Sequence, residues 1–313
     1  MSQNEKRVES NVDPPRLQDR VALIVGAGRG IGEAIAVRFA AERAHLILAA
    51  RTTRELETVA KRIRAAGGTA LVVATDVTAA EQVTNLVQKS VETFGHVDIL
   101  VNAAGIYGPI GRAWEVDAQE WVNTFSVNLF SVFLLCQRVV PHMIRAGRGK
   151  IINFSGGGAT SPLCRFSAYG VSKAAVVRFT ETLAEELKEF NVQVNAIAPG
   201  AVDTKLQDSV LAAGEKAGDL LQRISRLRET GEGGTPREVP AELSVFLASD
   251  DSRNLTGRLI SAPNDKWESW TEQRLAEIMA KPWFTLRRLD SFTLRPLLEE
   301  MRAEVATAQA NRR

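Results

Sequence analysis

The chain has 313 residues, of which 45% are hydrophobic and 24% charged, a composition typical of a globular protein with a sizeable core. Its 39 lysines and arginines nearly cancel its 37 aspartates and glutamates, so charge gives no case for binding nucleic acid or an anionic membrane. This length favours one large domain with appendages over two full domains. The only cysteines, Cys136 and Cys164, lack metal-ligand spacing, and we expect free thiols rather than a disulfide.

Residues 1–16 are polar and charged, which predicts a disordered N-terminal tail and no signal peptide. No uninterrupted apolar run along the chain reaches the length of a membrane span. We therefore expect a soluble, cytoplasmic protein.

From residue 20 onward, short apolar runs alternate with stretches of helical periodicity. Strands are expected at residues 21–25, 45–50, 70–75, 97–101, 150–154 and 193–198, with helices between them, among them 54–66 and 79–94. This alternation predicts a single α/β domain over residues 17–262, with a Rossmann-like, doubly wound parallel sheet flanked by helices. Such sheets bind ligands at the carboxyl ends of their strands.

The first expected strand runs into Gly26-Ala27-Gly28-Arg29-Gly30-Ile31-Gly32, which opens directly into a helix. Glycines let the backbone turn tightly and approach a phosphate closely, and the helix N-terminus supplies free N–H groups. The spacing is Gly-x-x-x-Gly-Ile-Gly rather than the general Gly-x-Gly-x-x-Gly. The pattern indicates a phosphate-binding loop; the alternative is an ordinary glycine-rich turn.

The end of the second expected strand bears on the choice of cofactor. NAD sites usually place a carboxylate there, but this strand ends in Ala49-Ala50-Arg51-Thr52. Arg29 in the loop offers a second guanidinium. Two cations without a carboxylate suit the 2′-phosphate of NADP, so NADP (as NADPH) is favoured over NAD. The alternative is that both arginines are simply solvated.

Tyr169 and Lys173 lie four residues apart in an expected helix, which places them on one face. A tyrosine is a poor acid or base at neutral pH until its phenolate is stabilised, and a nearby ammonium should lower its pKa toward the working range. Taken alone, the pair is more readily explained as a solvated surface pair.

Two later regions depart from the alternation. Residues 201–240 are rich in glycine and charge, which predicts a mobile helical lid with a loop. Residues 263–313 form a C-terminal extension whose aromatic surface should pack on the body or on a neighbouring subunit. Its large aromatic residues are Trp267, Trp270, Trp283, Phe284 and Phe292.

Six motifs follow one another across residues 17–262: the Gly26–Gly32 loop, Asp76-Val77, Asn102-Ala103-Ala104-Gly105, Asn128, Tyr169-x-x-x-Lys173, and Pro199-Gly200 followed by Thr204. In their order and spacing these motifs resemble those of the short-chain dehydrogenases/reductases. Six motifs in register are highly specific, and they make a catalytic tyrosine–lysine pair the better interpretation.

The resemblance implies a role for each matching position. The cofactor phosphates would lie against Gly26, Gly28, Arg29, Gly30 and Ile31, with Arg51 at the 2′-phosphate. Asp76 and Val77 would flank the adenine, and Asn102, Ala103 and Gly105 would line the middle of the channel. Pro199, Gly200 and Thr204 would position the carboxamide, and Lys173 would also hold the nicotinamide ribose. Asn128 would hold a water that relays protons from Lys173; the alternative is an asparagine that bonds only to backbone at a helix kink.

One position departs from the family pattern. The serine expected thirteen residues before Tyr169, which would bind the substrate oxygen, is replaced by Gly156. Losing such a donor typically costs about 3–4 kcal/mol in the transition state. Ser155, Ser161 or Ser167 could replace the hydroxyl, the substrate could bring its own polar group, or turnover could be feeble. We retain Ser155 as a catalytic candidate.

The sequence therefore predicts an enzyme that reversibly reduces a ketone or aldehyde, with hydride from the nicotinamide and a proton from Tyr169. Its expected partners are a small carbonyl or alcohol substrate and further copies of itself in a homodimer or homotetramer. We expect no metal, nucleic acid or membrane partner. The alternative is an NADP-binding sensor or scaffold with little turnover, which Gly156 favours.

Overall fold

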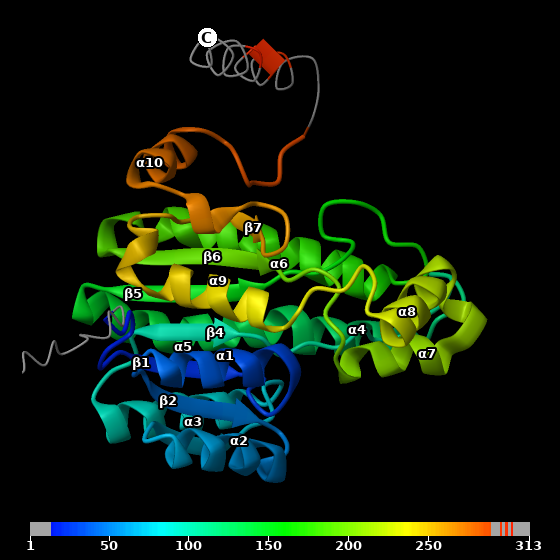
Figure 1. Ribbon diagram of the computed structural model, residues 1–313. Helices are drawn as coiled ribbons and strands as arrows, with labels where there is room; N and C mark the ends of the chain where they lie inside the picture. Colours follow the sequence, from blue (N-terminus) through cyan, green and yellow to red (C-terminus); the bar gives the residue numbers. More distant parts are fainter. Residues whose placement is uncertain (1–13, 289–294, 296–297, 300–301, 303–313) are drawn as a thin grey trace, which may run out of the picture.

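The protein was examined as a computed structural model, which describes residues 14–288, 295, 298–299 and 302. Seven parallel strands form one sheet in the order β3-β2-β1-β4-β5-β6-β7 (Figure 1). This confirms the Rossmann-like sheet. Six strands lie within two residues of their predicted bounds, and the seventh was not predicted. The strands are β1 (Val21–Val25), β2 (His45–Ala50), β3 (Thr69–Ala74), β4 (Ile99–Asn102), β5 (Gly149–Phe154), β6 (Val192–Ala198) and β7 (Leu259–Ser261).

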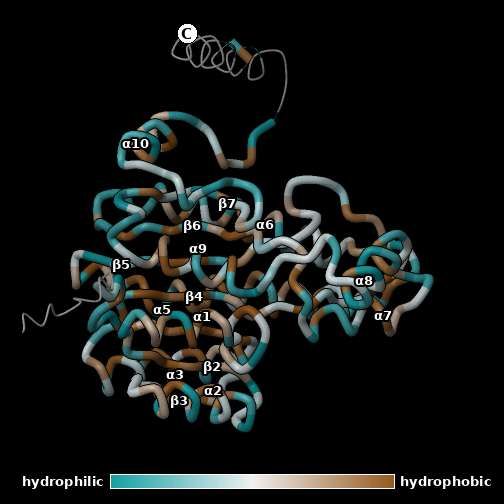
Figure 2. Tube along the Cα trace, viewed as in Figure 1, coloured by the Kyte–Doolittle hydropathy of each residue, from teal (hydrophilic) through white to brown (hydrophobic). Residues whose placement is uncertain are grey.

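Helices cover both faces of the sheet, which is why the strands are apolar along their whole length. In β1, Ala22 and Ile24 face one core while Leu23 and Val25 face the other. Figure 2 shows this apolar interior beneath a more polar surface. The first core lies under α1 (Gly30–Ala41), α2 (Thr53–Ala65) and α9 (Glu238–Ala248), and the second under α3 (Ala80–Phe94), α5 (Ser131–Ala146) and α6 (Ser167–Glu186).

The helix before β5 is continuous but changes its winding. It comprises α4 (Ala118–Phe125), a π-helical stretch η1 (Ser126–Phe130) and α5. By length and composition alone this helix could cross a membrane. However, α5 packs on α3 and β5, while α4 and η1 pack on α6, as expected for a core helix of a globular domain.

The region expected to form a lid is largely helical and lies at the carboxyl ends of the strands (Figure 1). It comprises η3 (Lys205–Gln207), α7 (Asp208–Ala213), η4 (Gly214–Ala217) and α8 (Asp219–Thr230). Its mobility stays a prediction.

The C-terminal extension packs on the body, as its aromatic residues predicted. Trp267, in η6 (Trp267–Ser269), is buried in the first core beside Leu275 and Ile278; these two lie in α10 (Glu272–Ala280). Trp270, Trp283 and Phe284 pack against the same core, whereas Phe292 lies outside the described residues.

The extension also covers one edge of the sheet. The amide of Leu259 in β7 donates to the carbonyl of Phe284 at 2.7 Å. The buried Arg258 guanidinium donates to the carbonyls of Ile278 at 3.0 Å and Lys281 at 3.1 Å. The β7 edge is therefore occupied by the chain's own C-terminal segment.

Of the expected N-terminal tail, residues 1–13 lie outside the described residues, while Arg16 forms ion pairs with Glu42 and Glu242. The two cysteines are free thiols in different settings. Cys136 is buried in α5, and Cys164 is exposed on the loop between β5 and α6.

Candidate active site

A cleft of about 340 Å³ opens at the carboxyl ends of the strands, between the glycine loop, α6 and the lid. Most of the predicted site residues line it: Gly26, Gly28, Arg29, Ile31, Arg51, Asp76, Val77, Ala103, Gly105, Ser155, Tyr169, Lys173, Pro199 and Thr204. Gly30, Asn102, Asn128 and Gly200 are not among the lining residues. The predicted set therefore combines residues that line this cleft with residues outside its lining.

The glycine loop is shaped by close backbone contacts. A Cβ on Gly32 would lie 2.2 Å from the carbonyl oxygen of Gly26, and one on Gly26 would lie 2.8 Å from the amide nitrogen of Ala104. Only glycine fits these positions, and Gly26 also has a φ of +86°. The loop brings the first amides of α1 to the cleft, where no side chain caps them. An uncapped helix N-terminus of this kind fits the diphosphate of a dinucleotide.

At the adenosine end of the cleft, the cations that the sequence singled out share the space with a carboxylate. Glu55 in α2 pairs with Arg29 at 3.3 Å and with Lys205 of the lid at 3.5 Å. Two hydrogen bonds from Thr78 lower the pKa of Asp76, and the exposed Arg51 lowers it further by a smaller amount. Sequence reasoning missed Glu55 and Lys205, because the acid follows the strand end by one helical turn and the lysine lies 150 positions away.

The tyrosine–lysine pair is buried at the start of α6. Tyr169 is 6% exposed and Lys173 is 5% exposed, and the Lys173 ammonium lies 5.8 Å from the centre of the Tyr169 ring. The ammonium donates to the carbonyl of Phe154 at 2.8 Å. That bond anchors the lysine to the end of β5 and holds it inside the cleft.

Burial dominates the acid–base properties of this pair. It raises the pKa of Tyr169, with a smaller contribution from Tyr107, and lowers the pKa of Lys173 to about 8. The pKa of Tyr169 is therefore raised by burial and not lowered toward the working range, contrary to the sequence prediction. Both groups are desolvated, so Tyr169 firmly keeps its proton at neutral pH.

No serine side chain stands where the family hydroxyl would be. A Cβ on Gly156 would lie 2.1 Å from the Tyr169 hydroxyl oxygen, so the tyrosine itself fills that space. Ser161 is exposed and outside the cleft lining, and the Ser167 hydroxyl accepts a bond from the Trp121 indole at 3.2 Å. Ser155 lines the cleft, but its Oγ is shielded from solvent and lacks a hydrogen-bond partner among the described residues.

Asn102 and Asn128, the two asparagines of the sequence motifs, lie behind the cleft and fix its walls. Asn128, in the π-helical stretch, accepts from the amide of Ile106 and donates to its carbonyl, each at 2.9 Å, and donates to Ser172 Oγ at 3.0 Å. Asn102 donates to Asn153 at 2.8 Å and so ties β4 to β5. The Asn128 side chain thus holds the loop after β4 in place, and its role in a water relay stays a prediction.

A second tyrosine, which the sequence reasoning did not single out, lies beside Tyr169. Tyr107 is 7% exposed, lines the cleft, and meets the Tyr169 ring edge-on with 4.6 Å between ring centres. Its hydroxyl is bonded to Gln207 of the lid at 3.1 Å. It follows Gly105 by two positions, so its place directly after a matched motif was the available signal.

The comparisons with known proteins agree with this geometry. Residues 20–214 match the family described as short chain dehydrogenase. The chain belongs to the short-chain dehydrogenase/reductase family. It is 39% identical to the short-chain reductase protein NovJ of Streptomyces niveus, over 78% of this chain and 92% of the relative. It is 36% identical to the 3-oxoacyl-[acyl-carrier-protein] reductase FabG of Thermotoga maritima, over 78% of this chain and 96% of that protein.

Among solved structures, NAD⁺-bound xylitol dehydrogenase superposes with a TM-score of 0.74 at 27% identity, covering 79% of this chain and 98% of the other. As a short-chain dehydrogenase/reductase, the protein is an oxidoreductase that acts on CH–OH groups of small molecules with a nicotinamide cofactor. The family match ends at residue 214, before the C-terminal extension begins.

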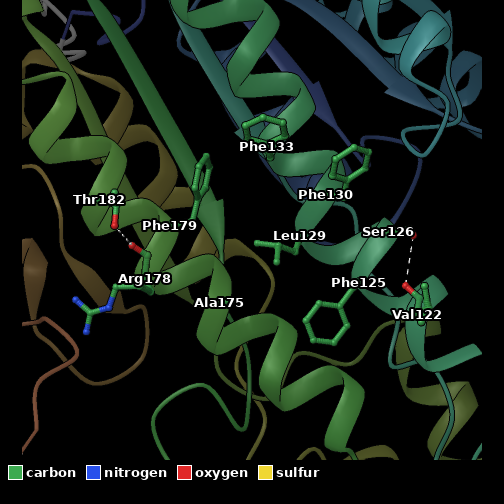
Figure 3. Close-up of a pocket in the computed structure, with 10 residues that line it drawn as sticks. All are labelled: Val122, Phe125, Ser126, Leu129, Phe130, Phe133, Ala175, Arg178, Phe179 and Thr182. Carbon is green, nitrogen blue, oxygen red and sulfur yellow. Dashed lines mark hydrogen bonds between the residues drawn. The ribbon is translucent and has the colours of Figure 1, made fainter. Parts of the chain in front are cut away.

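A second cavity, of about 560 Å³, is separate from the cleft that holds Tyr169 and Lys173. It lies on the outer face of α4, η1, α5 and α6 (Figure 3). Phenylalanines dominate its walls, and Phe130 and Phe133 are 49% and 39% exposed. The Phe130 and Phe133 rings stack at 6.0 Å, and Phe179 meets Phe133 edge-on at 6.3 Å. We call this surface the phenylalanine groove.

Proposed function

We propose that this short-chain dehydrogenase/reductase reversibly reduces a ketone or aldehyde to an alcohol, with NADPH as the reductant. The observation that carries the proposal is the position of Tyr169 and Lys173. Both side chains are buried in the same cleft that the glycine loop and the α1 N-terminus enter. An acid–base pair and a dinucleotide-binding loop that share one enclosed space suit hydride transfer coupled to proton transfer.

The side chains of this cleft supply the proton chemistry. A reduced nicotinamide bound here would supply the hydride to the carbonyl carbon. Tyr169, whose pKa is raised by burial, holds its proton at neutral pH and can give it to the carbonyl oxygen as negative charge develops. Lys173 is protonated below about pH 8 and stabilises the phenolate that remains. In the reverse direction, the Tyr169 phenolate, stabilised by the Lys173 ammonium, would accept the proton of the alcohol.

The test is turnover of NADPH against a panel of ketones and aldehydes. We expect Tyr169→Phe to lose roughly a hundredfold to ten-thousandfold in kcat, the range that general acid catalysis contributes. The variant should bind NADPH as tightly as the wild type, measured by fluorescence titration. If the wild type matches Tyr169→Phe on every carbonyl while both bind NADPH, the protein is a sensor or scaffold rather than an enzyme.

The preference for NADPH rests on Arg29 and Arg51 at the adenosine end of the cleft. Within the described residues, no salt bridge engages Arg51, so its charge is available to a 2′-phosphate. Two observations weigh on the other side: Glu55 pairs with Arg29, and xylitol dehydrogenase, a structural neighbour, binds NAD⁺. The preference for NADPH over NADH therefore depends on whether the two arginines contribute more to cofactor binding than Glu55 does.

For the assembly we propose a homodimer formed through the phenylalanine groove. Exposed phenylalanines in a groove of this size are costly in water, and a second copy would bury them. Because a helical face can meet its own symmetry mate, the same residues would serve both subunits. The β7 edge is covered by the chain's own extension, which leaves the groove as the better surface for a second copy.

A further inference from the structure

The carbonyl-binding side of the cleft has too few donors. Gly156 offers no hydroxyl, Ser161 and Ser167 lie outside the residues that line the cleft, and Ser155 Oγ is shielded from solvent. Tyr169 remains as the donor to a substrate oxygen. The group that completes the site must therefore be another side chain beside Tyr169, and it must match what the substrate presents.

Tyr107 has the right position and is held rigidly. Its ring lies edge-on between Tyr169 at 4.6 Å and Phe166 at 5.2 Å. It is buried and lines the same cleft as Tyr169, against whose ring it packs. A substrate whose carbonyl reaches Tyr169 would therefore also meet Tyr107.

The hydrogen bonds of Gln207 fix what Tyr107 can offer. The Gln207 side-chain amide nitrogen donates to the carbonyl of Val202 at 3.3 Å, and a carbonyl can only accept. The amide oxygen of Gln207 is thereby turned toward Tyr107 and accepts the tyrosine's only hydroxyl proton, at 3.1 Å. Tyr107 consequently presents an oxygen lone pair, an acceptor, to the cleft.

We propose that Tyr107 accepts a hydrogen bond from a hydroxyl on the carbon next to the reacting carbonyl, so that the substrates are α-hydroxy carbonyl compounds and the products vicinal diols. The inference rests on the proposed carbonyl reduction. A plain ketone offers acceptors alone and has nothing to donate to Tyr107. An α-hydroxy ketone accepts from Tyr169 through its carbonyl and donates to Tyr107 through its hydroxyl.

The redox step itself is unchanged by this second contact. The carbonyl carbon gains a hydride and its oxygen gains the Tyr169 proton, so the C=O bond becomes CH–OH while the neighbouring hydroxyl is retained. The reductant is the nicotinamide cofactor of the proposed function. Tyr107 acts as a specificity-determining residue that positions the substrate without exchanging a proton with it.

The experiment compares ketones in matched pairs that differ by one hydroxyl: 3-hydroxybutan-2-one with butanone, and 2-hydroxycyclohexanone with cyclohexanone. We expect the wild type to favour the hydroxylated member by about tenfold or more in kcat/KM. Tyr107→Phe keeps the ring and removes the acceptor. It should lower kcat/KM for the hydroxylated member about tenfold more than for the plain ketone, as expected for one lost hydrogen bond.

Gln207→Leu tests the same contact and should change the activity on plain ketones in the opposite direction. Without the amide oxygen, the Tyr107 proton is free to turn toward a carbonyl, so the variant should gain on plain ketones and its preference for the hydroxyl should shrink. NADPH affinity and the melting temperature of both variants verify that the cleft still folds. Equal effects of Tyr107→Phe on both members of each pair, or no preference in the wild type, would overturn the inference. Absence of turnover with every carbonyl would instead remove the proposed function on which it rests.

Discussion

At the scale of single residues, the contact between Gly156 and Tyr169 separates this chain from the family pattern. The Tyr169 hydroxyl oxygen lies only 2.1 Å from where a Cβ on Gly156 would be. The glycine is therefore part of how the tyrosine is placed, and a serine at this position would displace the Tyr169 hydroxyl.

We accordingly expect Gly156→Ser to lower kcat about tenfold or more, because overpacking at a buried site typically costs about 1–3 kcal/mol. Gly157→Ala is the matched control in the same loop, since its Cβ would meet only Leu163 at 3.6 Å. Steady-state reduction of a carbonyl substrate measures both variants. A gain in activity for Gly156→Ser would show that the tyrosine relaxes to admit the serine.

The pH dependence of reduction follows from Lys173. Burial lowers its pKa to about 8, so the ammonium is present at neutral pH and is lost as the pH rises through about 8. We expect log kcat/KM for reduction to be level below that point and to fall about tenfold per pH unit above it. Circular dichroism over the same range verifies that the fold persists. A profile that stays flat to pH 10 would contradict the assigned role of Lys173.

The residues that the sequence singled out were those with a fixed offset from a strand end or from one another. Tyr169, Lys173 and Arg51 belong to this group, and each lines the cleft. The residues that it missed act through contacts between distant segments. Tyr107 meets Gln207 across 100 positions, and Glu55 meets Lys205 across 150. Such pairs depend on how the lid packs over the sheet, which local patterns do not encode.

At the scale of elements, the charges at the adenosine end join three of them. Glu55 in α2 links Arg29, at the start of α1, to Lys205 in η3 of the lid. The glycine loop and the lid are also in direct contact, since a Cβ on Gly30 would lie 3.1 Å from a methyl group of Thr204. A cofactor that enters the cleft must therefore compete with, or replace, the ion pairs of Glu55.

This arrangement yields a paired prediction on cofactor choice. Glu55→Gln should tighten NADPH binding about fivefold, because it removes a charge that repels the 2′-phosphate and is worth about 1 kcal/mol at a solvated site. Arg51→Asp should weaken NADPH binding much more than NADH binding. Glu57→Gln and Arg54→Asp, on the same helix but outside the cleft lining, serve as controls. Loss of NADH binding in Glu55→Gln, with NADPH unaffected, would assign Glu55 to a ribose hydroxyl and NAD to the enzyme.

The elements themselves were largely predictable because buried parallel strands are continuous apolar runs between helices. The seventh strand, β7, escaped because it has three residues and its outer partner is the extension. A helix kink at Asn128 was one of the alternatives given for that residue, and a π-helical stretch does carry it, but the bonds of its side chain to Ile106 join distant segments that local patterns do not encode.

At the scale of the whole molecule, the phenylalanine groove and the covered β7 edge together limit how copies can meet. The groove offers exposed apolar side chains, while the edge is bonded to Phe284 of the same chain. In the proposed homodimer, the phenylalanine groove forms the interface and the β7 edge remains covered by the extension.

We expect Phe130→Glu to convert the dimer to a monomer at micromolar concentration, measured by light scattering coupled to size exclusion. A buried carboxylate facing its own symmetry mate would oppose association by both desolvation and repulsion. Phe190→Glu is the control, because Phe190 is 40% exposed but lies outside the groove. A wild type that is monomeric, or a Phe130→Glu variant of unchanged mass, would refute this interface.

The two thiols differ in exposure, which allows one of them to be labelled selectively. Cys136 is buried and its pKa is raised to about 12, so it resists alkylation, whereas Cys164 is exposed. Its neighbour Arg165 lies against the lid, where a Cβ on Gly218 would be 3.6 Å from the arginine side chain. A maleimide fluorophore added to the unmodified protein would thus attach at Cys164 alone, where its emission would follow the lid as cofactor is titrated.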